Sequence, residues 1–139
     1  MQFPVEQLTL NDQIIAIIIR SEFSKPGIEF FTPGDFSQQL GYMKHKKGDT
    51  IQEHIHVLHV REIQYTLETL FIKSGRVKIN FYHPDKSFFT SRELKTGDVI
   101  LLASGGHGFD FLEETEMIEV KQGPYCGDQD KVRFVEKKE

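Results

Sequence analysis

The sequence has one cysteine, no long apolar run and no excess of basic residues, and each absence excludes a class of protein. Cys126 has no partner for an intramolecular disulfide, which favours a reducing compartment. The most apolar run, Ile14 to Ile19, is far shorter than the roughly 20 residues that a membrane-spanning helix needs. The net charge is -4 and the longest basic run is the KHKK at 44–47, so we expect no nucleic-acid binding.

The N-terminal residues do not have the pattern of a secretory signal. They carry no Lys or Arg before Arg20 and no small-residue cleavage site. We therefore expect a cytoplasmic protein without membrane contact. A length of 139 residues with 38% hydrophobic residues is typical of one domain, which we expect to span 1–139.

Short apolar, β-branched or aromatic runs recur about every ten residues, with Gly, Pro and Asp between them. This spacing predicts an all-β sandwich or closed barrel and no βαβ units. Only residues 33–42 favour a helical turn or two, with Asp35 as N-cap. The predicted strands cover residues 13–20, 27–33, 39–45, 54–60, 68–74, 76–83, 87–94, 98–104, 107–113 and 116–122.

Two hairpins are predicted from the turn residues. One covers 68–82 and turns at 74–75, and its second arm alternates apolar with polar residues. The other covers 91–104 and turns at 96–98. Its second arm, 99–103, is apolar on both faces, as expected for a strand deep in a two-layer β structure.

The stretch EHIHVLH at 53–59 contains three of the six histidines. In a strand, His54 and His56 would project from the same face, whereas His59 would project from the other. These seven residues alone favour a chance cluster on a solvent-facing strand over a metal site.

The histidine pair is part of a longer spaced pattern. Residues 48–56 have the form G-x5-H-x-H, residues 68–75 have the form E-x6-G, and residues 97–107 carry a further pair of glycines before a histidine. The members of this pattern are Gly48, His54, His56, Glu68, Gly75, Gly97, Gly105 and His107. With these motifs the chain resembles the cupin superfamily over residues 41–122, between N-terminal strands in 1–40 and a tail at 123–139.

The resemblance implies an all-β fold with little helix, the cupin jelly-roll β-barrel or double-stranded β-helix. It also implies one divalent transition metal ion (Fe, Ni, Zn, Mn or Co), held by His54, His56, Glu68 and His107. Two departures stand out. Eleven residues separate His56 from Glu68, more than in the usual motif, and Glu62 lies closer to the expected distance, which leaves Glu62 as the alternative carboxylate ligand. In the second motif, Ala103 replaces the usual proline.

The chain resembles small cupins of bacterial polysaccharide gene clusters, which implies a metal-binding enzyme, such as an isomerase, epimerase or oxygenase, for a sugar or another oxygen-rich metabolite. A non-catalytic binding module and a metal-free sugar epimerase are the alternatives. The proton-moving group would be Glu62, Tyr65 or Tyr82, and Arg61 and Gln64 would bind the ligand. Arg61 and Glu62 are equally consistent with solvent-facing charges on a lengthened edge strand.

We also expect a homodimer. The strand at Ile14–Ile19 is apolar on both faces and lies before the motif core, so it could pair with a partner's sheet.

Overall fold

The computed structural model describes residues 3–138, so residues 1, 2 and 139 of the predicted domain lie outside the described residues. Within this range the chain is nearly all-β, as predicted, and its sheets are antiparallel. The strands are β1 (Val5–Leu10), β2 (Gln13–Ile19), β3 (Gly27–Phe30), β4 (Gly41–Lys44), β5 (Glu68–Ser74), β6 (Arg76–Tyr82), β7 (Phe88–Lys95), β8 (Val99–Leu102), β9 (Gly106–Phe111) and β10 (Glu116–Lys121).

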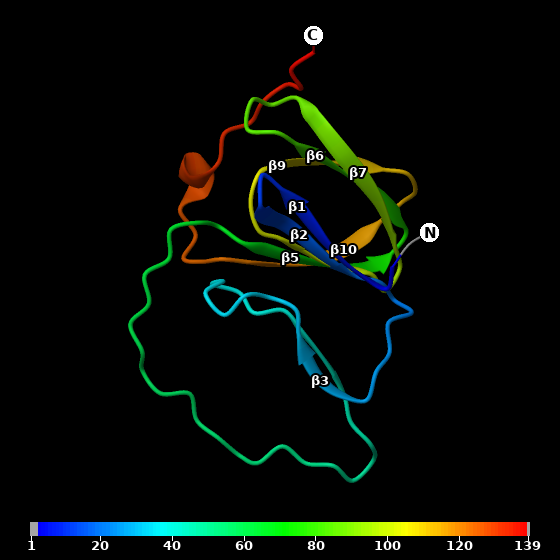
Figure 1. The fold of residues 1–139 in the computed structure, drawn as a ribbon, viewed down its shortest axis with the longest axis vertical. Helices are drawn as coiled ribbons and strands as arrows, with labels where there is room; N and C mark the ends of the chain where they lie inside the picture. The colour runs from blue at the N-terminus through cyan, green and yellow to red at the C-terminus, as the bar shows by residue number, and fades with distance from the viewer. Residues whose placement is uncertain (1–2, 139) are drawn as a thin grey trace.

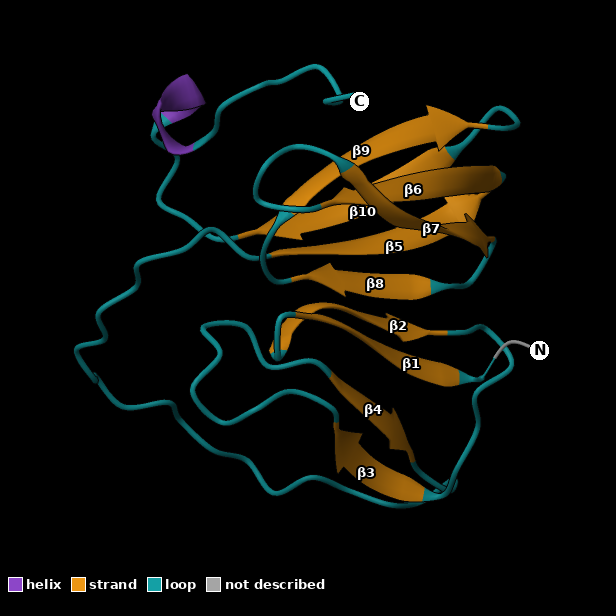
Figure 2. Cartoon of the chain, turned by 45° about the horizontal axis from the view of Figure 1, so that its top comes forward, coloured by secondary structure: helices purple, strands orange, loops and turns teal. Residues whose placement is uncertain are grey.

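The strands form three sheets (Figures 1 and 2). The largest has the order β1-β2-β8-β5-β10, the second has the order β7-β6-β9, and β3 pairs only with β4. The main hydrophobic core contains buried residues of both larger sheets. These two sheets therefore form the two layers of the molecule.

The predicted strands at 68–74 and 76–83 are confirmed as β5 and β6, but the hairpin between them is wrong. β5 pairs with β8 and β10 in the larger sheet, whereas β6 pairs with β7 and β9 in the other. The alternating residues Val77, Ile79 and Phe81 are almost completely buried, as are Leu70 and Ile72 on β5. Apolar residues at every second position put one face of each strand into the core, and burial of that face is the main force that holds the two layers together.

The five-stranded sheet is covered on part of its outer face as well. Ile17 on β2 and Leu101 on β8 are buried there beneath a second apolar cluster that includes Phe31, Phe36 and Leu40. The continuous apolar runs of β2 and β8 follow from this position, because a strand buried on both faces needs apolar side chains on both.

The second predicted hairpin is wrong. β7 pairs with β6, whereas β8 pairs with β2 and β5, so residues 95–99 carry the chain from one sheet to the other. The turn residues marked a reversal of direction correctly. Turn residues do not determine which sheet the next strand joins. β8 joins the larger sheet because its side chains are apolar on both faces, and only a central strand of that sheet is buried on both.

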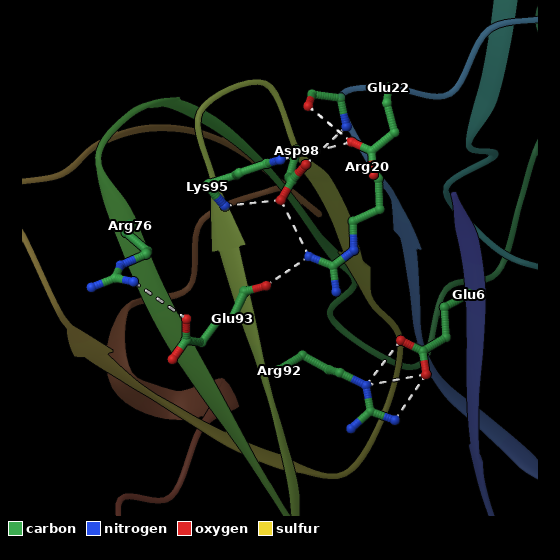
Figure 3. A network of polar contacts seen from close by, with 9 residues as sticks. Glu6, Arg20, Glu22, Arg76, Arg92, Glu93, Lys95 and Asp98 are labelled. Atoms are coloured by element: carbon green, nitrogen blue, oxygen red, sulfur yellow. Dashed lines mark hydrogen bonds and ion pairs between the residues drawn. The ribbon is translucent and has the colours of Figure 1, made fainter. Parts of the chain in front are cut away.

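A polar network holds this crossing in place (Figure 3). The fully buried Asp98 carboxylate accepts hydrogen bonds from the backbone N–H groups of Ser21 and Lys95, each at 2.8 Å. It also pairs with the buried Arg20 guanidinium at 3.2 Å, and Arg20 donates to the Glu93 carbonyl oxygen at 2.6 Å. The network joins β2 to the end of β7 and the start of β8.

The predicted strand at 54–60 is absent. Residues 45–67 leave the sheets as one long excursion without regular structure, visible as the wide loop in Figures 1 and 2. The alternation of its residues is typical of a strand, but a strand also requires a neighbour to complete its hydrogen bonds, and these residues pair with none.

Three other predictions need correction. Residues 33–42 contain turns and no helix, while a short 3-10 helix occupies Gly127–Asp130. β1 was not predicted, and it pairs with β2. Because β2 lies between β1 and β8, it is not an edge strand and cannot pair with a partner's sheet as proposed. No helix within residues 3–138 is long and apolar enough to cross a membrane.

Candidate functional site

The cleft that contains His107 lies at one end of the two main sheets. Its volume is about 880 Å³, and its walls come from β5, β6, β9 and β10 together with the C-terminal segment 130–136. Residues from both sheets therefore meet at this end of the core.

Strand register places four polar side chains on the faces that the two sheets turn toward each other. Glu68 pairs with Leu102 and Lys121, and Glu119 pairs with the buried Leu70. Directly paired residues project from the same face of a sheet, so Glu68, Glu119 and Lys121 share the core-facing side. On the other sheet His107 pairs with the buried Phe81, which puts its imidazole on the inner face too.

The backbone around His107 depends on two glycines. Gly105 has a φ of +81°, which disfavours any residue with a Cβ atom. At Gly106 a Cβ atom would approach the Phe134 ring to 2.9 Å, so the strand can lie close under the C-terminal segment only because this side chain is absent. The Gly105-Gly106 pair thus fixes the start of β9 and the position of His107.

Burial lowers the pKa of His107 below the ordinary value of 6.5, and the charge of Lys131 contributes to this lowering. The charges of Glu68 and Glu119 and a backbone hydrogen bond to Gly105 act in the opposite direction. The net effect leaves the imidazole neutral at neutral pH, with carboxylates nearby that stabilise it when it takes a proton.

Sequence reasoning missed Glu119 and Lys121. The Lys121 ammonium lies 3.8 Å from the Glu119 carboxylate, and both side chains are partly exposed to the cleft. The run EMIEVKQ at 116–122 could have predicted them. Glu119 and Lys121 lie two and four residues after Met117, which packs against the core, so in a strand all three project from the same face. Charged residues at core-facing positions near the end of a strand indicate a polar site at the rim of a core.

Tyr82 lines the same cleft from a different side. It pairs with Gly106, next to the Phe81 and His107 pair, so its ring projects from the opposite face of the sheet. There it packs against the ring of Phe134, with ring centroids 5.3 Å apart. Burial, and then the charges of Glu136 and Asp110, raise the pKa of the Tyr82 phenol, which keeps it protonated.

The structure separates the predicted histidine pair from this cleft. His54 and His56 lie on the exposed excursion, where their rings are 5.2 Å apart, and neither lines the cleft. Of the four predicted metal ligands, the fold brings only Glu68 and His107 to one cleft.

The remaining predicted residues lie on the same excursion. Glu62, Gln64 and Tyr65 line a second cavity of about 770 Å³, together with residues 12–14 and 33–37, and Tyr65 also borders the His107 cleft. The exposed Arg61 donates a long hydrogen bond, 3.4 Å, to the carbonyl oxygen of His59.

The four predicted metal ligands do not come together in the described arrangement. Within residues 3–138, no three side chains of His, Cys, Asp or Glu lie close enough together to hold one. Of the four predicted ligands, one imidazole and one carboxylate reach the cleft, which are too few for a transition-metal site of the expected type.

Comparison with protein-family models, curated proteins and solved structures gives no match for this chain. The likeness to cupins therefore depends on the motifs in the chain itself.

Proposed function

We propose that this chain is a small cupin-type enzyme with a jelly-roll fold, which moves a proton on an oxygen-rich carbonyl ligand such as a keto sugar. The observation that carries the proposal is the partly buried, neutral His107, which faces Glu68, Glu119 and Lys121 across the mouth of the cleft. A neutral imidazole near carboxylates and an ammonium group provides a base and an electrostatic partner within one site.

The proposed step is the removal of a proton from the carbon next to the ligand's carbonyl group. The neutral imidazole of His107 takes the proton, and the electron pair of the broken C–H bond moves to the carbonyl oxygen as an enolate forms. Lys121 stabilises the developing negative charge, and Glu68 stabilises the imidazolium. Return of the proton to the same carbon or its neighbour completes an epimerisation or isomerisation.

Exchange of hydrogen with solvent tests this step directly. The protein is incubated in D2O with a panel of free and nucleotide-linked keto sugars, and deuterium in each sugar is measured by mass spectrometry. We expect exchange at the carbon next to the carbonyl for at least one compound, and a loss of about 100-fold or more in His107→Gln. His83→Asn is the matched control, because His83 occupies a turn outside the cleft.

The pH dependence separates the base from its neighbours. The exchange rate should be constant near pH 7 and fall as the pH drops through the lowered pKa of His107, because the protonated imidazole cannot accept a proton. In Glu68→Gln this fall should move to lower pH, because the carboxylate raises the pKa of His107. An unchanged profile in Glu68→Gln would show that Glu68 has only a structural role.

Two outcomes contradict the proposed reaction. A compound that binds in the cleft without exchange would support the non-catalytic binding module. A panel with neither binding nor exchange would reject both readings for this class of ligand.

The bound metal ion is a second candidate function, favoured by the spacing of Gly48, His54, His56 and Glu68. It requires residues 45–67 to adopt a different position from the one described above. Elemental analysis of protein purified without chelator tests it, and the expected result is about one equivalent of metal that is mostly lost in His54→Ala. Absence of bound metal, or retention of the full equivalent in His54→Ala and His107→Ala, would reject this ligand set.

A further inference from the structure

Two apolar surfaces of this chain are left exposed. The first is the segment 54–61 in the long excursion, where Ile55, Val57, Leu58 and Val60 are 80–97% exposed. In Figure 1 this excursion extends well away from the sheets. Four apolar side chains within six residues, in a stretch without sheet partners, are a concentration of exposed apolar surface of the kind that marks an interaction site.

The second surface is the outer patch, formed by Phe71 on β5 with Ile118 and Val120 on β10. Ile118 pairs directly with Phe71, and the three side chains are 41–61% exposed. The same face of the sheet is covered over β2 and β8 by the cluster around Phe31, whereas the apolar side chains over β5 and β10 are left exposed. The outer patch is thus an uncovered apolar part of a face that is buried at its centre.

We propose that the outer patch binds segment 54–61 of a second copy of this chain, so that two copies exchange their segments in a symmetric dimer. One contact of this kind covers both exposed surfaces, and two-fold symmetry repeats it. Exchange of an identical element between protomers is a common route to dimers. The proposal is independent of the chemistry at His107.

The charges of the two surfaces favour this pairing. Segment 54–61 has no carboxylate, and it carries Arg61 and three histidines. The outer patch ends beside a carboxylate-rich stretch, 113–116, which contains Glu113, Glu114 and Glu116. Glu113 and Glu116 pair with Arg76 and Lys73, while Glu114 has no ion-pair partner among residues 3–138. Arg61 of a second copy would therefore approach a stretch with a net negative charge.

The path of residues 45–67 favours binding of the outer patch to segment 54–61 of a second copy over binding to segment 54–61 of the same chain. Residues 62–65 lie in the cavity with residues 12–14 and 33–37, which belong to the β1-β2 side of the sheet. β10 is the opposite edge, three strand spacings from β2, which is about 14 Å. Covering the outer patch within one chain would require segment 54–61 to fold back across the sheet from that cavity, whereas the described excursion extends away from the sheets, toward where a second copy would lie.

A mixing experiment with the full chain tests the proposal. Light scattering coupled to size exclusion should give about twice the 16.1 kDa of one chain for the unmodified protein. Leu58→Asp and Val120→Asp should each weaken dimerisation on the order of 100-fold, because each places a charge in an apolar contact. Val135→Asp, at a position that is 89% exposed but outside both surfaces, should remain a dimer.

The decisive sample is an equimolar mixture of the Leu58→Asp and Val120→Asp chains. One intact segment and one intact patch then face each other, so a heterodimer should form at concentrations where each variant alone is monomeric. Circular dichroism checks that each variant is folded, and Val60→Asp with Ile118→Asp provides a second pair. A monomeric unmodified protein at 100 μM, single variants that remain dimers, or a mixture that stays monomeric would overturn the proposal.

Discussion

Asp98 allows the sharpest prediction about stability, because its carboxylate is fully buried and has three hydrogen-bond donors. Asp98→Ala removes the counter-ion of Arg20, whose side chain is only 3% exposed and whose Nε already has no hydrogen-bond partner among the described residues. The same change leaves the N–H groups of Ser21 and Lys95 without an acceptor. Removal of one partner from a buried ion pair costs about 3–5 kcal/mol.

For a domain of this size, the loss corresponds to a decrease of roughly 10–20 °C in Tm. Urea and thermal unfolding, followed by circular dichroism, measure both quantities. Asp110→Ala is the control, because Asp110 is an exposed partner of Lys78 at 3.8 Å and should cost less than about 1 kcal/mol.

A double variant identifies the cause of the loss. If the uncompensated charge of Arg20 accounts for most of the cost, then Arg20→Met combined with Asp98→Ala should be more stable than Asp98→Ala alone. A cost below about 1 kcal/mol for Asp98→Ala, or a double variant whose cost equals the sum of the two single costs, would refute this reasoning.

Three further predictions concern other parts of the chain. Gly75→Ala should lower the free energy of unfolding by about 2 kcal/mol or more, because Gly75 has a φ of +98° and a Cβ atom there would lie 2.6 Å from the Thr115 hydroxyl. Gly34→Ala is the control in the same urea titration. It should change the free energy of unfolding little, because a Cβ atom at Gly34 meets no atom within 4 Å. The hydrogen bond from Arg92 lowers the pKa of Glu6 below 4.5. The stabilisation from this pair is therefore present above pH 4.5 and is lost as the pH falls through the lowered pKa. Glu6→Gln should be less stable than the unmodified chain at pH 7 and equal to it near pH 2. In the metal-binding alternative, in which residues 45–67 take a different position, Arg61→Ala and Glu62→Gln should leave metal content unchanged and abolish ligand binding. Calorimetry that shows full binding in both variants would make the excursion purely structural.

Local pattern was sufficient to predict most strands of this fold. Alternating side chains in the 76–82 arm predicted β6 and its buried face, and the two-sided apolar run at 99–103 predicted that β8 is buried on both faces. Partner choice was not predictable in the same way. The sequence around 96–98 indicates a turn, but which sheet receives β8 depends on the packing of β2 and β5 around it.

The candidate site, too, was predicted only in part. The motif spacing named Glu68 and His107, which share a cleft, together with His54 and His56, which the described structure leaves outside it. Spacing along the chain determines how far apart two residues can lie but not whether they meet. Glu119 and Lys121 could have been found from parity alone, because they continue the core-facing positions of β10 beyond Met117.

The place of β2 beside β8 also determines the order in which the molecule can assemble. Ile17 pairs with Leu101, so this ladder closes a loop that contains most of the chain, including the 45–67 excursion. Loop-closure entropy makes such a pairing slow, whereas the β6-β7 hairpin requires only a short turn. We expect β6 and β7 to form early, with β2 docking late against β8, and a destabilising substitution at Ile17 to accelerate unfolding more than it slows folding.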